Sequence, residues 1–132
     1  MKATEILIVE DVVVFAKQVK LRLESKGYSV IGIVDNGPDA IKFAEDKNPD
    51  IILMDITLNG TMTGLDAARE IVKSKRIPII FLTANSDKSI LESGRKISKN
   101  SVFTKPFSDN ELHMAIQQVI ISNAMASMLD KD

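Results

Sequence analysis

Five short runs of apolar residues alternate along the chain with longer segments whose apolar positions recur every three or four residues. The runs are rich in Ile and Val, are bounded by polar residues, Gly or Pro, and occupy 5–10, 28–34, 50–55, 77–83 and 101–105. Continuous apolar runs of this length are typical of parallel strands covered on both faces. The helical period is found between and after them, at 12–26, 38–47, 64–75, 87–97 and 108–121.

A strand–helix unit repeated five times predicts one α/β domain with a doubly wound five-stranded parallel sheet, a (βα)5 fold with helices on both faces. Ser108 and Glu111 have the spacing of a capping box at the start of the last helix. The domain is expected to span 1–122, and 123–132 is expected to extend or fray that helix. Met125 and Met128 would offer a partner-binding face in a helical tail, but fraying is the simpler interpretation.

Composition excludes several classes of protein. The 132 residues are 45% apolar and 27% charged with a net charge of −1, which is ordinary for one globular domain. The absence of a strongly basic segment argues against direct nucleic-acid binding, and the absence of Cys excludes disulfides and thiolate metal sites. Because the sequence shows neither a membrane span nor a signal peptide, we expect a cytoplasmic protein without membrane contact.

Polar side chains end the predicted strands. The carboxyl ends of parallel strands share one edge of the sheet, where ligands bind. The residues at that edge are Glu10, Asp11, Asp35, Asp55, Thr83 and Lys105. Taken singly, Asp11 would be a helix cap, Thr83 a turn residue and Lys105 a solvated loop residue. Asp35 ends the second strand, which we expect at the border of the sheet, and is therefore interpreted as structural.

These residue types together favour phosphoryl transfer. Three carboxylates in close proximity cannot all stay ionised cheaply without a cation, and Mg²⁺ or another divalent ion such as Mn²⁺ would relieve their repulsion while keeping room for a phosphate oxygen. Asp55 can act as a nucleophile toward phosphorus and form an aspartyl phosphate. Thr83 and Lys105 would then stabilise the phosphoryl oxygens, and the small Ala84 leaves space for them.

Four motifs in this order resemble the receiver domain of two-component response regulators. They are LIVED with Glu10 and Asp11, IILMD with Asp55, IIFLTA with Thr83 and Ala84, and FTKPF with Lys105 and Pro106. The resemblance covers about residues 5–121. It implies a flavodoxin-like fold in which the strands, numbered along the chain, lie in the order 2-1-3-4-5.

The resemblance implies a role for each acid. Asp55 would accept a phosphoryl group from a phosphohistidine on a sensor histidine kinase or a phosphotransfer protein. Asp11 and Asp55 would bind Mg²⁺ directly, the backbone carbonyl of Thr57 would be a further ligand, and Glu10 would act largely through water. Such a domain is a signalling switch and not an enzyme, apart from gaining and losing its own phosphoryl group.

The remaining motif residues would sense the phosphoryl group. Thr83 would hydrogen-bond it beside Ala84, Lys105 would pair with one of its oxygens, and the Lys105–Pro106 bond would be cis. The resemblance implies an output surface that binds an unknown downstream protein or domain, or a second copy of the chain. This surface would consist of 87–97, 101–105 and 108–121.

The sequence departs from the family pattern at several positions. The loop after Asp55 reads LNGTMTG, one residue longer than usual, with Thr63 where Asp is common. Val102 occupies the position of the usual switch aromatic. The neighbouring Phe103 is expected in the core instead, because adjacent strand residues point to opposite faces.

Two other functions stay open. The unusual loop is compatible with a pseudo-receiver that only binds a partner, although the intact acids argue against it. A phosphatase with an aspartyl nucleophile would need an acid two residues after Asp55, where the chain has Thr57. Thr57 and Asn85 are expected to flank the attacking water and to tune the lifetime of the phosphorylated state. His113, the single histidine, is expected to be a solvated surface residue.

Overall fold

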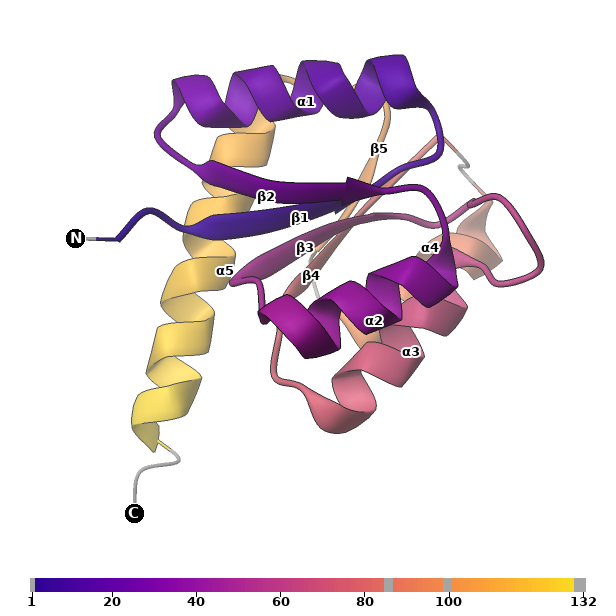
Figure 1. The fold of residues 1–132 in the computed structure, drawn as a ribbon. Helices are drawn as coiled ribbons and strands as arrows, with labels where there is room; N and C mark the ends of the chain where they lie inside the picture. The colour runs from indigo at the N-terminus through magenta and orange to yellow at the C-terminus, as the bar shows by residue number, and fades with distance from the viewer. Residues whose placement is uncertain (1, 85–86, 99–100, 130–132) are drawn as a thin grey trace.

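Each predicted strand is present and is followed by a helix (Figure 1). The structure is a computed structural model that describes residues 2–84, 87–98 and 101–129. The strands are β1 (Glu5–Val9), β2 (Ser29–Val34), β3 (Ile51–Asp55), β4 (Ile79–Thr83) and β5 (Val102–Thr104). The helices are α1 (Val13–Ser25), α2 (Gly37–Lys47), α3 (Gly64–Ser74), α4 (Lys88–Ile97) and α5 (Asp109–Leu129).

All neighbouring strands pair in parallel, and the sheet order is β2-β1-β3-β4-β5. The predicted doubly wound fold and strand order are therefore confirmed. Helices α1 and α5 cover one face of the sheet, and α2, α3 and α4 cover the other (Figure 1). β1 and β3 lie in the middle, where the order of the strands reverses, which is where such sheets bind ligands.

Two hydrophobic clusters hold the layers together. Alternate residues of the central strands point to opposite faces, so Leu53 packs toward α1 and α5 while Ile52 and Met54 pack toward α2 and α3. The same alternation separates Val102, which packs toward α4, from Phe103, which packs toward α1 and α5. The prediction that Phe103 belongs to the core is confirmed, although its side chain is only half-buried.

Side-chain caps fix where several helices begin. Ser108 Oγ accepts a hydrogen bond from the Glu111 N–H (3.0 Å), and a Glu111 carboxylate oxygen accepts one from the Ser108 N–H (3.1 Å), which confirms the predicted capping box. Thr63 and Asp66 form a second capping box at α3. Each box satisfies two backbone donors that the first turn of a helix leaves unpaired.

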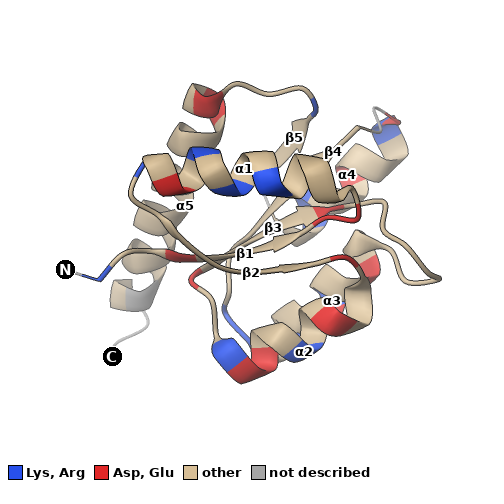
Figure 2. Cartoon of the chain, turned by 45° about the horizontal axis from the view of Figure 1, so that its top comes forward, with Lys and Arg blue, Asp and Glu red and all other residues tan. Residues whose placement is uncertain are grey.

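The last helix is longer than its domain-facing pattern predicts. α5 continues to Leu129, so residues 123–129 lie within the helix. Most of α5 is free of charged residues, whereas α1 to α4 carry many (Figure 2). Among the described residues, no helix is long and apolar enough to cross a membrane.

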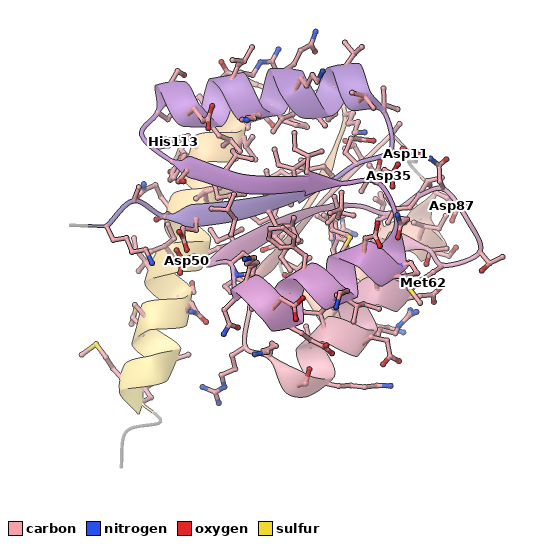
Figure 3. The ribbon with its side chains drawn as sticks, in the orientation of Figure 1. Asp11, Asp35, Asp50, Met62, Asp87 and His113 are labelled. Atoms are coloured by element: carbon pink, nitrogen blue, oxygen red, sulfur yellow. The ribbon has the colours of Figure 1, made fainter. Side chains whose placement is uncertain are left out.

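The single histidine corrects one prediction. His113 is half-buried and not a solvated surface residue, and its Nδ1 lies 2.9 Å from the hydroxyl of Tyr28. Gln117 Nε2 donates a hydrogen bond to the same hydroxyl (3.1 Å). Tyr28 is separated from His113 by 85 residues. Figure 3 places His113 near the end of the sheet opposite Asp11, so it has no part in a site at the strand ends.

Candidate functional site

The carboxyl ends of the central strands bring the predicted site residues together. Glu10 directly follows β1, Asp55 is the last residue of β3, and Thr83 is the last residue of β4. These residues are buried, with only 3% of the whole residue exposed at Glu10, 7% at Asp55 and none at Thr83. Apolar strands that are buried on both faces thus carry polar side chains to the edge of the core, where they can meet a ligand.

Lys105 is the centre of the hydrogen-bonding at this edge. Its Nζ donates to Glu10 Oε1 (2.6 Å) and to Asp55 Oδ2 (3.1 Å). Its backbone N–H donates to the carbonyl of Thr83 (2.8 Å), which fixes the start of the loop after β5. Only 17% of the Lys105 side chain is exposed, so the interpretation of Lys105 alone as a solvated loop residue is wrong. The Lys105–Pro106 bond is cis, as predicted.

An aromatic ring completes the surroundings of the ammonium group. Lys105 Nζ lies 4.2 Å from the ring centroid of Phe15 in α1, within the range of a cation–π interaction. Phe15 in turn meets Phe107 edge to face, with 6.0 Å between the ring centroids. The sequence places Phe15 on an apolar helical stripe and gives no signal of its contact with Lys105.

The charges of this cluster determine the ionisation of Lys105. Burial lowers the pKa of Lys105, but the hydrogen bond to Glu10 and the negative charge of Asp55 outweigh burial, so its pKa is raised. The group therefore stays an ammonium ion at neutral pH. It can donate to a new anion without first taking up a proton.

The three acids form a group that suits a divalent cation. Glu10, Asp11 and Asp55 each offer a carboxylate oxygen, and these oxygens all lie within 4.8 Å of one another. Burial raises the pKa of Asp11, and the hydrogen bond with Glu10 and the charge of Glu10 raise it further. Lys105 can neutralise only one of the three negative charges. An all-oxygen donor set with residual negative charge fits Mg²⁺ or Mn²⁺.

The backbone after β3 is held close to Asp55. The Thr57 N–H donates to Asp55 Oδ1 (3.1 Å), and the Gly64 N–H donates to the carbonyl of Ile56 (2.7 Å). A Cβ at Gly64 would lie 1.9 Å from the carbonyl oxygen of Asp55. Gly64 therefore allows the first turn of α3 to approach the end of β3. Sequence reasoning missed this role, whose signal is a glycine directly after a helix cap.

The long loop between β3 and α3 packs against the start of α2. Asn59 forms a parallel bridge with Asn36, and Met62 lies against Gly37, where a Cβ would be 2.6 Å from the sulfur. Figure 3 shows Met62 beside α2 at the same end of the sheet as Asp11. Thr63, which stands where the family commonly has Asp, caps α3. The longer loop is thus anchored by contacts with the start of α2.

Three other residues singled out from the sequence, Ala84, Asp35 and Thr57, are exposed. Ala84 is exposed directly after β4. Asp35 is exposed, accepts a hydrogen bond from Asn36 Nδ2 (2.7 Å) and stays outside the group of three acids, which agrees with its structural interpretation. The side chain of Thr57 is exposed, and its role as a carbonyl ligand stays a prediction. Asn85 lies outside the described residues.

The comparison with known families agrees with this geometry. A family model for the response regulator receiver domain matches residues 6–117. The chain belongs to the response regulator receiver domain family. The matched range contains Asp55, the adjacent acids and Lys105.

Two proteins with sequences similar to this chain are named as regulators. Over 119 residues the chain is 34% identical to the phyllosphere-induced regulator PhyR of Methylorubrum extorquens, which covers 89% of the chain and 44% of that protein. It is 32% identical over 115 residues to the transcriptional regulatory protein PdtaR of Mycobacterium tuberculosis, covering 87% of the chain and 56% of that protein. The chain thus spans about half the length of these relatives.

A solved structure of similar size shares the fold. The signal receiver domain of a modulated diguanylate cyclase from Desulfovibrio desulfuricans superimposes with a TM-score of 0.88 at 33% sequence identity. The match covers 95% of this chain and 99% of the other. The topology around the acids is therefore that of a receiver domain.

Proposed function

We propose that the chain is a phosphorylation-controlled switch in which Asp55 accepts a phosphoryl group from a phosphohistidine of a sensor kinase or a phosphotransfer protein. An Asp55 carboxylate oxygen would attack phosphorus, the phosphorus–nitrogen bond would break, and the imidazole would keep the electron pair. The observation that carries this proposal is the buried carboxylate of Asp55, held between an ammonium group and two further acids.

The neighbours of Asp55 have the chemistry to support the transfer. Glu10, Asp11 and Asp55 would hold Mg²⁺, which would supply positive charge against the phosphoryl oxygens. Lys105 would exchange its present carboxylate partners for a phosphoryl oxygen, and the hydroxyl of Thr83 would donate to another. Lys105 and Thr83 already lie at the same edge of the sheet as Asp55, so donors for the arriving negative charge are close at hand.

The output would arise at the surface formed by α4, β5 and α5. In α4 Gly94 is buried, and the other residues are half-buried or exposed, so the helix is held by few apolar contacts. Elements with few buried contacts change position at low free-energy cost. Val102 lies under Gly94, where an added Cβ would be 3.0 Å from its side chain. An aromatic rotamer switch is not available at this position, so movement of Thr83 and α4 would carry the signal.

The alternatives gain no support from the structure. The long loop that left a pseudo-receiver open packs against α2, and the three acids and Lys105 are assembled. The position two residues after Asp55, where a phosphatase would need an acid, is an exposed Thr57. The downstream partner and the cytoplasmic location stay predictions.

Phosphoryl uptake tests the proposal. Incubation with acetyl phosphate and Mg²⁺ should add the mass of one phosphoryl group to the intact protein, and EDTA should prevent the addition without unfolding the protein. Equal labelling in EDTA would contradict the metal's role. An unlabelled but folded protein in Mg²⁺ would instead favour a binding module.

The switch is tested separately from phosphoryl uptake. The Thr83→Ala variant should still gain the phosphoryl group, but phosphorylation should then change amide exchange in α4 and β5 less than in the wild type. An unchanged exchange response in this variant would contradict the role of Thr83.

A further inference from the structure

A cavity of about 800 Å³ opens between the loop after α3 and one side of α5. It lies at the end of the strands opposite Asp55, because Ile77 and Pro78 on one wall precede β4, and Ser101 precedes β5. Cavities that hold small molecules in proteins commonly have volumes of about 300 to 1,000 Å³. The phosphoryl and metal site proposed above uses none of the residues that line this cavity.

The wall that α5 contributes is elongated. It contains residues spaced three or four apart along one side of the helix, which are Ala115, Gln118, Val119, Ser122 and Ala126. At a rise of about 1.5 Å per residue, this wall is about 16 Å long. An extended ligand lying along the helix would therefore contact more of the lining than a compact one.

Apolar side chains form the floor and both rims of the cavity. On the floor, Ile77 and Ala115 are each 7% exposed, and they belong to the hydrophobic clusters on the two faces of the sheet. At the rims, Val72 of α3 is 44% exposed and Ile121 of α5 is 56% exposed. A ligand with an apolar body would remove this surface from water, which favours binding.

The charged residues of the lining are cations. Lys75 and Arg76 lie in the loop after α3, and none of the described residues that line the cavity is Asp or Glu. Lys75 is half-buried, and within the described part of the chain its ammonium group has no hydrogen bond or ion pair. The α5 wall supplies no countercharge, because residues 112–129 include no Asp or Glu. A half-buried cation without a partner is unfavourable, so the cavity also favours an anionic group.

We propose that this cavity binds a small amphipathic carboxylate, whose apolar chain lies along α5 and whose carboxylate pairs with Lys75. Gln118, Ser122 and Asn123 line the same cavity, and their amide and hydroxyl groups can donate hydrogen bonds to the ligand's oxygens. The surface of a bilayer is too flat to reach the buried floor, so a free carboxylate fits better than a lipid headgroup. Binding is independent of the phosphorylation proposed above.

An NMR titration of the isotope-labelled chain with octanoate, without phosphodonor, tests the location of the site. The backbone amide signals of Ile77, Val119 and Ser122 should shift until they saturate, whereas those of Glu10 and Asp55 should stay in place. Octan-1-ol has the same chain without the charge, and it should bind about fivefold more weakly because it forms no ion pair. Equal affinities for octanoate and octan-1-ol, or shifts centred elsewhere, would overturn the proposal.

Substitutions on the two walls test the role of charge. Lys75→Gln should lower the affinity for octanoate about fivefold and leave the affinity for octan-1-ol unchanged. Ser122→Glu places a carboxylate at an exposed position of the α5 wall and should also weaken octanoate binding. Lys73→Gln is the matched control, because Lys73 is exposed and lies outside the lining. An equal loss of octanoate affinity in Lys73→Gln and Lys75→Gln would reduce the interaction to general surface charge and contradict the site.

Other occupants of the cavity would give different results in the same experiment. If the signals of Ile77 and Ser122 shift when the protein alone is concentrated, a second copy of the chain fills the cavity. If octanoate at millimolar concentration shifts no signal, the lining does not accept an amphipathic anion. Either result overturns the proposal. Because no phosphodonor is present, both results leave the assignment of Asp55 unaffected.

Discussion

Replacing Lys105 by Met should destabilise the metal-free protein, because it leaves buried carboxylates without their cation. Methionine keeps an unbranched chain beside Phe15 and removes the charge. Lys105 Nζ now lies 2.6 Å from Glu10 and 3.1 Å from Asp55, whose side chains are only 3% and 8% exposed. The perturbation therefore acts on charge pairing and largely spares packing.

The expected cost follows from the burial of the pair. Removing one partner of a buried ion pair costs about 3 to 5 kcal/mol, and the partial exposure of Lys105 reduces our expectation to about 2 to 3 kcal/mol. The pKa of Lys105 is raised from its ordinary value of 10.5. Its stabilising contribution is therefore complete below that value and is lost only as pH rises through the raised pKa, so the loss should be present throughout the neutral range.

Urea unfolding in EDTA, followed by circular dichroism, measures this cost. Lys73→Met is the matched control, since Lys73 Nζ lies 2.9 Å from Glu70 but both side chains are more than half exposed, and it should cost at most about 1 kcal/mol. Mg²⁺ should restore part of the stability of Lys105→Met by supplying another cation. Equal, small losses in the two variants would refute the electrostatic account of the site.

Three further substitutions test other parts of the structure. Asp11→Asn should stabilise the metal-free protein at neutral pH, because the raised pKa of Asp11 shows that its ionised form is unfavourable in the folded state. The gain in the free energy of unfolding should fade as pH falls toward the ordinary pKa of 3.8. A gain that does not change with pH in urea titrations would contradict this. Gly64→Ala should lower the free energy of unfolding by about 2 to 3 kcal/mol, because the added Cβ would clash with the end of β3. Gly60→Ala should lower it by about 1 kcal/mol, because Gly60 has φ +90° but its added Cβ would meet no neighbour. Similar shifts in melting temperature for the two variants would argue against the close approach of α3 to β3. Tyr28→Phe should cost about 1 kcal/mol through the lost hydrogen bond to His113, and unaltered chemical unfolding would show that this contact adds nothing.

The fold was predictable because each strand is a local pattern. The run Ile51–Met54 is apolar at every position, which requires burial on both faces. Once five such runs alternate with helices, handedness and parallel pairing leave few arrangements. Asp55 and Glu10 could be assigned to one site because the carboxyl ends of the strands must meet.

Contacts between distant residues could not be predicted in this way. The strand ends place Lys105 at the same edge of the sheet as Glu10, but they do not show that its ammonium group pairs with this carboxylate, which lies 95 residues away in the sequence. The bond between Tyr28 and His113 spans 85 residues in the same manner.

The acceptor assignment of Asp55 is the central claim, and the most direct measurement is the intact mass of matched variants after incubation with acetyl phosphate and Mg²⁺. The wild type and Asp35→Asn, which alters an exposed acid at the end of β2, should each gain one phosphoryl group. Asp55→Asn should gain none while unfolding cooperatively like the wild type. A phosphoryl group on the Asp55→Asn protein would contradict the assignment.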